Sequence, residues 1–91
     1  MTWKETNGTL TRELHTSNFL EAFRIVTALV APSEALGHHP DLAFGWGYVS
    51  ISLTTHDAGG VTDLDRQLAT RMDAVIDALD LKCHPSVTKD E

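Results

Sequence analysis

Three histidines stand at the predicted ends of structural elements, where their imidazoles could act together. His38 and His39 follow the first predicted helix, and His56 closes the longest predicted strand. Asp65 falls in the first turn of the last predicted helix. Histidine is the side chain best suited to proton transfer near neutral pH, so these four residues on one rim would support acid/base chemistry.

An aromatic pair could complete such a site. Trp46 and Tyr48 share strand parity with His56, which predicts an aromatic wall beside the imidazoles. A flat, nitrogen-rich heterocycle could stack on these rings while the imidazoles exchange its protons.

Each of these residues also has a structural interpretation. Histidines at a helix end are stabilised by the free carbonyls there, and the first turn of a helix favours an acid such as Asp65. Trp46 could belong to the core. The three histidines could bind zinc, but the adjacent His38 and His39 are poorly spaced for chelation and no pair of thiolates accompanies them.

The elements that must position these residues begin with a hairpin. Asn7-Gly8 is a strong signal for a type I′ turn, because both residues tolerate a positive φ. It separates two Thr-rich strands, predicted at 2–6 and 9–15, with Thr6 opposite Thr9.

A helix is predicted next, from an apolar stripe with three- and four-residue steps: Phe19, Ala22, Phe23, Val26, Leu29 and Val30. Ser17 or Asn18 can cap its start. Pro32 removes a backbone donor, so the helix either stops just before it or continues with a kink. Gly37 is the expected terminator.

The second half of the chain repeats the order of strand, strand and helix. A short strand is predicted at 42–44 and a long one at 48–56. Thr62 is expected to cap the last helix, with Asp65 acting on the exposed amides of its first turn. The chain is therefore predicted to be α+β, with a four-stranded antiparallel sheet and two main helices packed on one face.

The composition predicts one small domain over 1–91, with a loose polar tail at 82–91. Thirteen acidic against seven basic residues give a net charge of −6, which argues against binding to nucleic acid or an anionic membrane. No apolar run approaches the length of about twenty residues that spans a bilayer, and no secretory signal is recognisable. We expect a cytoplasmic protein whose small core favours self-association.

The candidate residues form one long gapped pattern, Glu34-x3-His38-His39-Pro40-x5-Trp46-x9-His56-x8-Asp65. This pattern resembles the signature of the pterin-4a-carbinolamine dehydratases. The neighbouring run YVSISLTTHDAGGVTDLDRQLA is similar to that family as well. The resemblance covers about residues 17–80 and matches every position of the motif.

The resemblance implies an activity. Family members dehydrate 4a-hydroxytetrahydropterin to quinonoid dihydropterin, which regenerates the cofactor of aromatic amino acid hydroxylases. They need no metal or organic cofactor and assemble as dimers or tetramers. For this chain the family thus implies a reduced pterin as substrate, a homodimer or homotetramer, and a link to a hydroxylase pathway.

The resemblance also implies the site. Its catalytic groups would be His38, His39, His56, Asp65 and Glu34, and its substrate-binding groups His38, His39, Pro40, Trp46 and His56. As a hypothesis, His38 and His56 form the acid/base pair and His39 positions the ring. Glu34 could polarise an imidazole or a water, and Asp65 could orient His56.

The chain departs from the family pattern at three places, none of which removes a motif residue. No leading helix is predicted ahead of the first strand, an aromatic pair is replaced around Leu10 and Leu14, and Pro32 falls inside the first predicted helix. The alternative function is a non-catalytic scaffold, because relatives include a dimerisation cofactor of a transcription factor and assembly proteins of a carbon-fixing enzyme. Retention of all three imidazoles favours catalysis.

Overall fold

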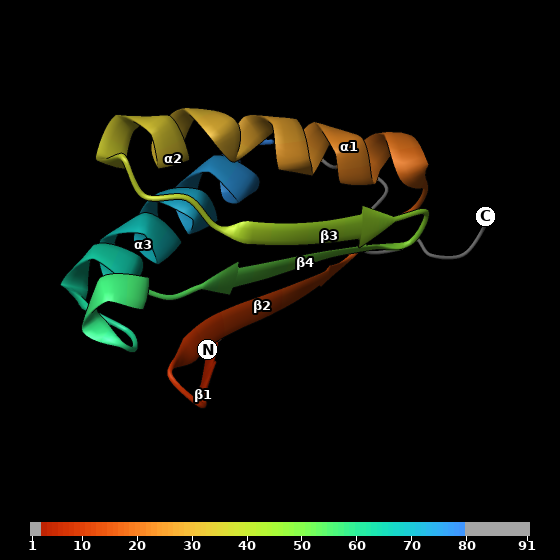
Figure 1. Ribbon diagram of the computed structural model, residues 1–91. Helices are drawn as coiled ribbons and strands as arrows, with labels where there is room; N and C mark the ends of the chain where they lie inside the picture. The colour runs from red at the N-terminus through yellow and green to blue at the C-terminus, as the bar shows by residue number, and fades with distance from the viewer. Residues whose placement is uncertain (1–2, 80–91) are drawn as a thin grey trace.

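The structure, a computed structural model, describes residues 3–79. Its elements are β1 (Lys4–Thr6), β2 (Thr9–His15), α1 (Phe19–Ala28), α2 (Val30–Leu36), β3 (Asp41–Gly45), β4 (Tyr48–Leu53), the 3-10 turn η1 (His56–Ala58) and α3 (Asp63–Ala78). The strands form one antiparallel sheet in the order β1-β2-β4-β3, with the helices on one face (Figure 1). The predicted α+β fold is confirmed, and the tail predicted at 82–91 lies outside the described residues.

The first hairpin has the predicted turn and register. Asn7 and Gly8 have φ of 52° and 77°, as a type I′ turn requires. The hairpin is tied to α3 through Asp73: the indole Nε1 of Trp3 donates to its Oδ1 at 2.8 Å, and the Arg12 guanidinium pairs with the same oxygen. Trp3 is therefore a packing residue, which anchors the sheet edge to the helix that carries Asp65.

The first predicted helix continues past its proline in two segments. Asn18 caps α1, since its side chain accepts from the backbone N–H of Glu21 at 2.8 Å. Pro32 has no N–H to donate to the carbonyl of Ala28, and its ring crowds that carbonyl. The helix therefore breaks at Leu29 and resumes as α2, nearly in line with α1 (Figure 1).

The predicted apolar stripe of the first helix is only partly buried. Ile25, outside that stripe, is 1% exposed, whereas Phe19, Phe23 and Val30 are 53%, 51% and 54% exposed. Phe19 stacks on Phe44 of β3, with ring centroids 5.5 Å apart. Because β3 is an edge strand, α1 has sheet beneath only one side, and its outer apolar side chains stay uncovered.

The core lies between the sheet and the helices. Val49, Ile51 and Leu53 alternate along β4 and are fully buried, as are Leu68 and Met72 of α3. Burial of large apolar side chains stabilises the fold by about 1.5–3 kcal/mol each. This packing fixes α3 across the sheet and so sets where its first turn lies.

Gly37 ends α2 and directs the chain toward the loop that carries the histidines. Its φ of 62° is left-handed, and the N–H groups of Gly37 and His38 bond back to carbonyls of the last helical turn. We expect Gly37→Ala to lower the free energy of unfolding by about 1 kcal/mol, because a Cβ is strained at that φ. Urea denaturation measures this loss. As a control, Gly47→Ala should change little, since its φ is not left-handed and its Cβ would lie 3.8 Å from the Thr16 carbonyl oxygen; equal losses would contradict the explanation.

Candidate active site

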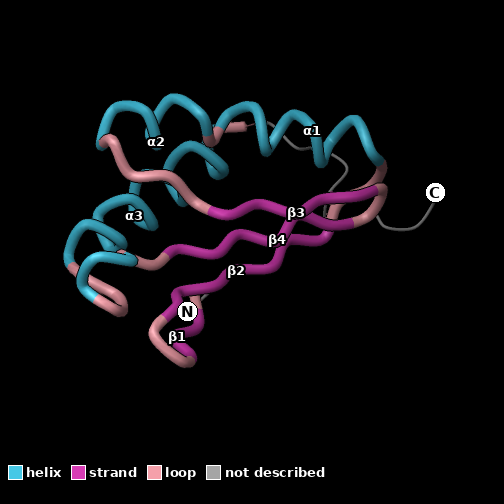
Figure 2. Tube along the Cα trace, in the orientation of Figure 1, coloured by secondary structure: helices cyan, strands magenta, loops and turns pink. Residues whose placement is uncertain are grey.

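Two loops meet at one end of the sheet. Residues 37–40 lead from α2 into β3, and residues 54–62 lead from β4 through η1 into α3 (Figure 2). They lie at the same end because β3 and β4 are antiparallel, so one begins where the other finishes. This end of the molecule therefore carries most of the predicted site residues: His38, His39, Pro40, His56 and Asp65.

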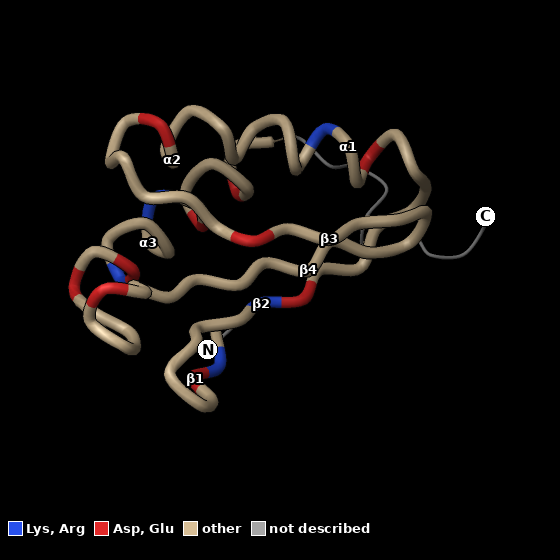
Figure 3. The backbone as a smooth tube through the Cα atoms, in the orientation of Figure 1, with Lys and Arg blue, Asp and Glu red and all other residues tan. Residues whose placement is uncertain are grey.

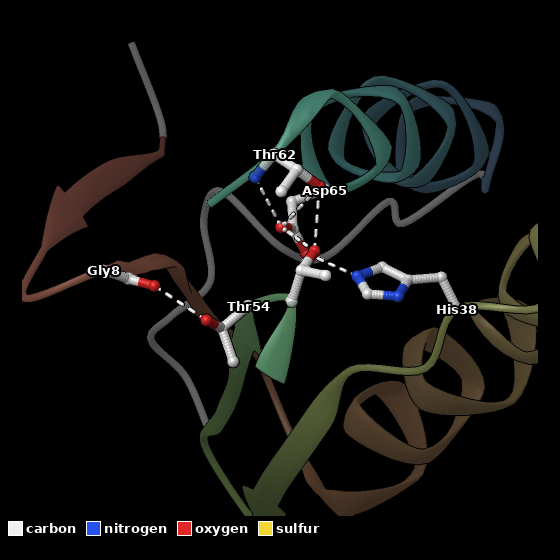
Figure 4. Close-up of polar contacts among 6 residues, drawn as sticks. Gly8, His38, Thr54, Thr62 and Asp65 are labelled. Atoms are coloured by element: carbon white, nitrogen blue, oxygen red, sulfur yellow. Dashed lines mark hydrogen bonds and ion pairs between the residues drawn. The ribbon is translucent and has the colours of Figure 1, made fainter. Parts of the chain in front are cut away.

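Asp65 is the centre of the polar contacts at this end. Its side chain is fully buried, and its Oδ1 lies 2.5 Å from Nε2 of His38 (Figure 4). Its Oδ2 accepts from the hydroxyl of Thr55 at 2.7 Å and from the backbone N–H of Thr62 at 2.9 Å. The last contact is the predicted capping interaction at the start of α3. Asp65 thus joins α3 to both loops.

These contacts keep the buried carboxyl ionised. Burial by itself raises the pKa of Asp65, but hydrogen bonds from Thr55, His38 and Thr62, together with the charge of His38, lower it below its ordinary value of 3.8. A carboxylate only accepts hydrogen bonds, so the Nε2 of His38 must carry the proton in this pair. In the neutral imidazole Nδ1 is then the unprotonated nitrogen, free to act as a base.

The lowered pKa of Asp65 predicts a specific loss of stability in acid. A carboxyl whose pKa is depressed in the folded state stabilises the fold above the unfolded value, near 3.8, and this stabilisation is lost as the pH falls through the folded pKa. We therefore expect the difference in unfolding free energy between wild type and Asp65→Asn to shrink below that pH. Denaturant titrations from pH 6 downward measure it, and other carboxyl groups cancel in the difference. A constant difference would contradict the prediction.

The hypothesis that Asp65 orients His56 is not met in the structure, where its partner is His38. The strand predicted to run to residue 56 ends at Leu53. Beyond it, Thr55 pairs only with Gly60, and the chain turns through η1, which places His56 on an exposed 3-10 turn. The reversal of the chain at this point, which brings Thr62 and Asp65 back to the sheet end, is what removes His56 from the strand.

His39 has a separate carboxylate partner. Its Nε2 lies 2.8 Å from Oε2 of Glu34, and both side chains are exposed. The pair borders an open, mainly apolar hollow of about 210 Å³ between α2 and the start of β3, lined by Leu29, Val30, Ser33, Glu34, His39, Pro40 and Leu42. Glu34, His39 and Pro40 therefore lie together at this hollow.

Trp46 is not brought to the imidazoles within one chain. It lies in the turn between β3 and β4, where Thr16 of the chain after β2 donates to its carbonyl at 3.1 Å. β4 has six residues, so at about 3.3 Å per residue Trp46 and His56 are separated by roughly 20 Å. Strand parity predicts whether two residues lie on the same face of a sheet. It does not predict whether they lie at the same end of a strand. Within the described residues of one chain, Trp46 therefore does not form the predicted aromatic wall beside the histidines.

Thr55 is the site residue that sequence reasoning missed. It has the strand parity of the buried Leu53 and, like Thr54, is half-buried. A hydroxyl at an inward-facing position needs a hydrogen-bond partner, and this requirement was the available signal. Only the fold shows that the partner is Asp65.

Other classes of site find no support in the described part of the chain. Between residues 3 and 79, no group of three His, Cys, Asp or Glu side chains is arranged to hold a metal ion. None of the helices described there is both long and apolar enough to cross a bilayer. Within residues 3–79 the basic positions are distributed over β1, β2, α1 and α3 (Figure 3), and they are Lys4, Arg12, Arg24, Arg66 and Arg71.

Comparison with known proteins identifies relatives that match most of this chain. The sequence model of the family described as pterin 4 alpha carbinolamine dehydratase matches residues 1–75. A Prochlorococcus marinus protein with the provisional name pterin-4-alpha-carbinolamine dehydratase is 43% identical over 74 residues, which cover 81% of this chain and 77% of the relative. A Paracoccus denitrificans protein with the same provisional name is 46% identical over 63 residues, covering 69% of this chain and 59% of the relative.

Two solved structures are similar to this one. A transcriptional coactivator/pterin dehydratase from Brucella melitensis has a TM-score of 0.75 and 30% identity, and the match covers 81% of each chain. A pterin dehydratase-like protein identified as a RuBisCO assembly factor in the alpha-carboxysome has a TM-score of 0.68 and 28% identity, covering 82% of this chain and 89% of that one.

Proposed function

Because the chain belongs to the pterin 4 alpha carbinolamine dehydratase family, we propose that it dehydrates 4a-hydroxytetrahydropterin to quinonoid dihydropterin by histidine acid/base catalysis. The observation that carries this proposal is the contact between Nε2 of His38 and the buried carboxylate of Asp65. It holds an imidazole in one tautomer, with Nδ1 available for a proton. Such an oriented base is what the reaction needs.

The reaction removes one water from the substrate. The C4a–O bond breaks, and a general acid protonates the departing oxygen. A general base takes the proton from the neighbouring ring nitrogen, whose N–H electrons form the new C=N double bond. Neutral imidazole and imidazolium can fill these two roles near neutral pH, and each role contributes about 10²- to 10⁴-fold in rate.

We assign the base to His38 and the second proton-transfer role to His56. In this assignment Asp65 fixes the tautomer of His38. The sequence-based hypothesis had Asp65 orient His56 instead. His56 stands on the neighbouring loop and is exposed, so it can reach a ligand bound over this end of the sheet. Two imidazoles on separate loops suit a reaction that needs an acid and a base at different atoms.

Substrate binding is assigned to the hollow beside His39. The hollow is mainly apolar, with Pro40 in its lining and the Glu34–His39 pair at its border. An apolar wall with a few polar groups suits a flat heteroaromatic ring. We place the pterin between this hollow and the loop of His56, with Glu34 fixing the orientation of the His39 ring.

Assembly into a homodimer or homotetramer is part of the proposal. The outer face of α1 exposes Phe19, Leu20 and Phe23, with Val30 following on α2. Contiguous exposed apolar side chains of this kind mark interaction surfaces. Sedimentation velocity should show a species larger than one chain of 10.0 kDa, and a monomer at micromolar concentration would contradict this part of the proposal.

A non-catalytic assembly role is the second candidate. The similarity to the RuBisCO assembly factor, with its TM-score of 0.68, favours it. It predicts a folded protein that binds partner proteins and does not accelerate dehydration. The Asp65–His38 pair favours the enzyme instead, because the capping contact with Thr62 uses Oδ2 of Asp65 and does not require an imidazole on Oδ1.

The deciding experiment measures dehydration directly. A hydroxylase generates 4a-hydroxytetrahydropterin in situ, and its decay to quinonoid dihydropterin is followed by absorbance with and without this protein. We expect acceleration that disappears in the double variant His38→Ala/His56→Ala. No acceleration by the folded wild-type protein would refute the enzymatic proposal and leave the scaffold.

A further inference from the structure

Thr55 connects the two halves of the candidate site. Its backbone is fixed by three hydrogen bonds: its N–H donates to the Gly60 carbonyl at 2.9 Å, and its carbonyl accepts from Ala58 at 3.0 Å and from Gly60 at 3.3 Å. Threonine is β-branched, so χ1 has few favourable wells once the backbone is fixed. The direction of the Thr55 hydroxyl is therefore set by the turn itself.

The hydrogen bonds of this hydroxyl have a defined direction. The Asp65 carboxylate only accepts, so the Thr55 hydroxyl is the donor in its 2.7 Å contact with Oδ2. A hydroxyl has a single proton, so the 2.8 Å contact with the hydroxyl of Thr62 must be donated by Thr62. Hydrogen bonds in such a chain polarise and strengthen one another. The chain thus runs from Thr62 through Thr55 to Asp65, which accepts from His38 on its other oxygen.

We propose that Thr55 is a positioning residue for the dehydration: its hydroxyl holds Oδ2 of Asp65, so that Oδ1 stays on Nε2 of His38 and Nδ1 faces the substrate unprotonated. The expected effect of Thr55 on the rate of dehydration rests on the proposed function. The tautomer of His38 rests on the hydrogen bonds alone. His56 directly follows Thr55, so the same backbone anchor also fixes the start of η1.

Three substitutions separate the hydroxyl from the rest of the residue. Thr55→Val removes the hydroxyl and keeps the β-branched shape, whereas Thr55→Ser keeps the hydroxyl. Thr54→Val is the matched control: it removes a half-buried hydroxyl one position earlier that donates to the Gly8 carbonyl at 2.8 Å rather than to Asp65 (Figure 4).

We expect Thr55→Val to lower kcat about tenfold or more with little change in KM, because a hydrogen bond to a charged group is lost while the binding hollow is untouched. Thr55→Ser should restore most of kcat, and Thr54→Val should retain it. Nitrogen-15 NMR of the imidazoles should report the Nε2–H tautomer of His38 in wild type and in Thr55→Ser. In Thr55→Val the signal should move toward a mixture of the two tautomers.

The nitrogen-15 spectrum and the kinetic measurements test the proposal independently of one another. An Nδ1–H tautomer of His38 in the wild-type protein would overturn the proposal, even if Thr55→Val does not fold. So would a folded Thr55→Val with wild-type kcat and an unchanged His38 spectrum. If the wild-type protein has no dehydratase activity, the proposed function fails, and the nitrogen shifts still decide whether Thr55 positions the pair.

Discussion

Replacing His38 with glutamine should lower the turnover of 4a-hydroxytetrahydropterin by about 10²- to 10⁴-fold, the contribution of one acid/base group. Glutamine places an amide N–H close to the position of Nε2, so the hydrogen bond to Oδ1 of Asp65, at 2.5 Å in the wild type, can be kept. The buried carboxylate then stays partnered, and the fold should survive. Because an amide does not titrate near neutral pH, only the proton transfer is lost. Initial rates of dehydration, with thermal unfolding followed by circular dichroism, measure both quantities.

His15→Gln is the matched control for His38→Gln. His15 is exposed and pairs with Tyr48 in the sheet, at the end opposite to the loops of the candidate site. The same chemical change there should leave kcat and the unfolding temperature near wild type. Wild-type turnover in His38→Gln, or an equal loss in both variants, would remove His38 from the catalytic assignment.

Asp65→Asn should inactivate the protein to a similar extent for a different reason. The Asn carbonyl is expected to face the two donors, the Thr55 hydroxyl and the Thr62 N–H, which leaves its amide N–H group toward His38. Nε2 of His38 must then accept, so the proton moves to Nδ1 and the base is lost. In the serine-protease triad the same exchange produces the wrong tautomer and lowers turnover about 10⁴-fold. We expect a loss of about 10²- to 10⁴-fold here, with nitrogen-15 shifts that report the Nδ1–H form.

Asp63→Asn distinguishes this effect from a general change at the start of α3. Asp63 also lies in the first turn of the helix, but its side chain is exposed. The exchange alters the charge near the helix N-terminus by the same amount and should cost at most about 1 kcal/mol of stability. Turnover close to wild type is expected. An Asp65→Asn protein with full activity and the Nε2–H tautomer would contradict the assigned role of Asp65.

Much of the fold could be predicted from sequence because its signals are local. The Asn7-Gly8 turn and the end of α2 at Gly37 depend on the φ angles that single residues tolerate. The capping of α3 by Thr62 and Asp65 depends on a spacing of three residues. Alternation along β4 predicted its buried face.

Predictions failed where a local pattern was extended over distance. The apolar stripe of the first helix predicted more burial than the sheet provides, because the helix lies over an edge strand and Phe19 and Phe23 remain exposed. Strand parity grouped Trp46 with His56, although the length of β4 keeps the two at opposite ends. Both errors concern the dimensions of the sheet, namely its width beneath α1 and the length of β4. The periodicity of apolar residues does not predict these dimensions.

The sequence by itself determined the chemical groups, the order of the elements and, through the spacing of the motif, the family. Only the tertiary structure decided which carboxylate serves which imidazole: Asp65 serves His38, Glu34 serves His39, and His56 stands on a separate turn. The physical reason is that Asp65 and His38 are 27 residues apart, so their hydrogen bond depends on how α3 packs against α2 and in the core beneath the sheet.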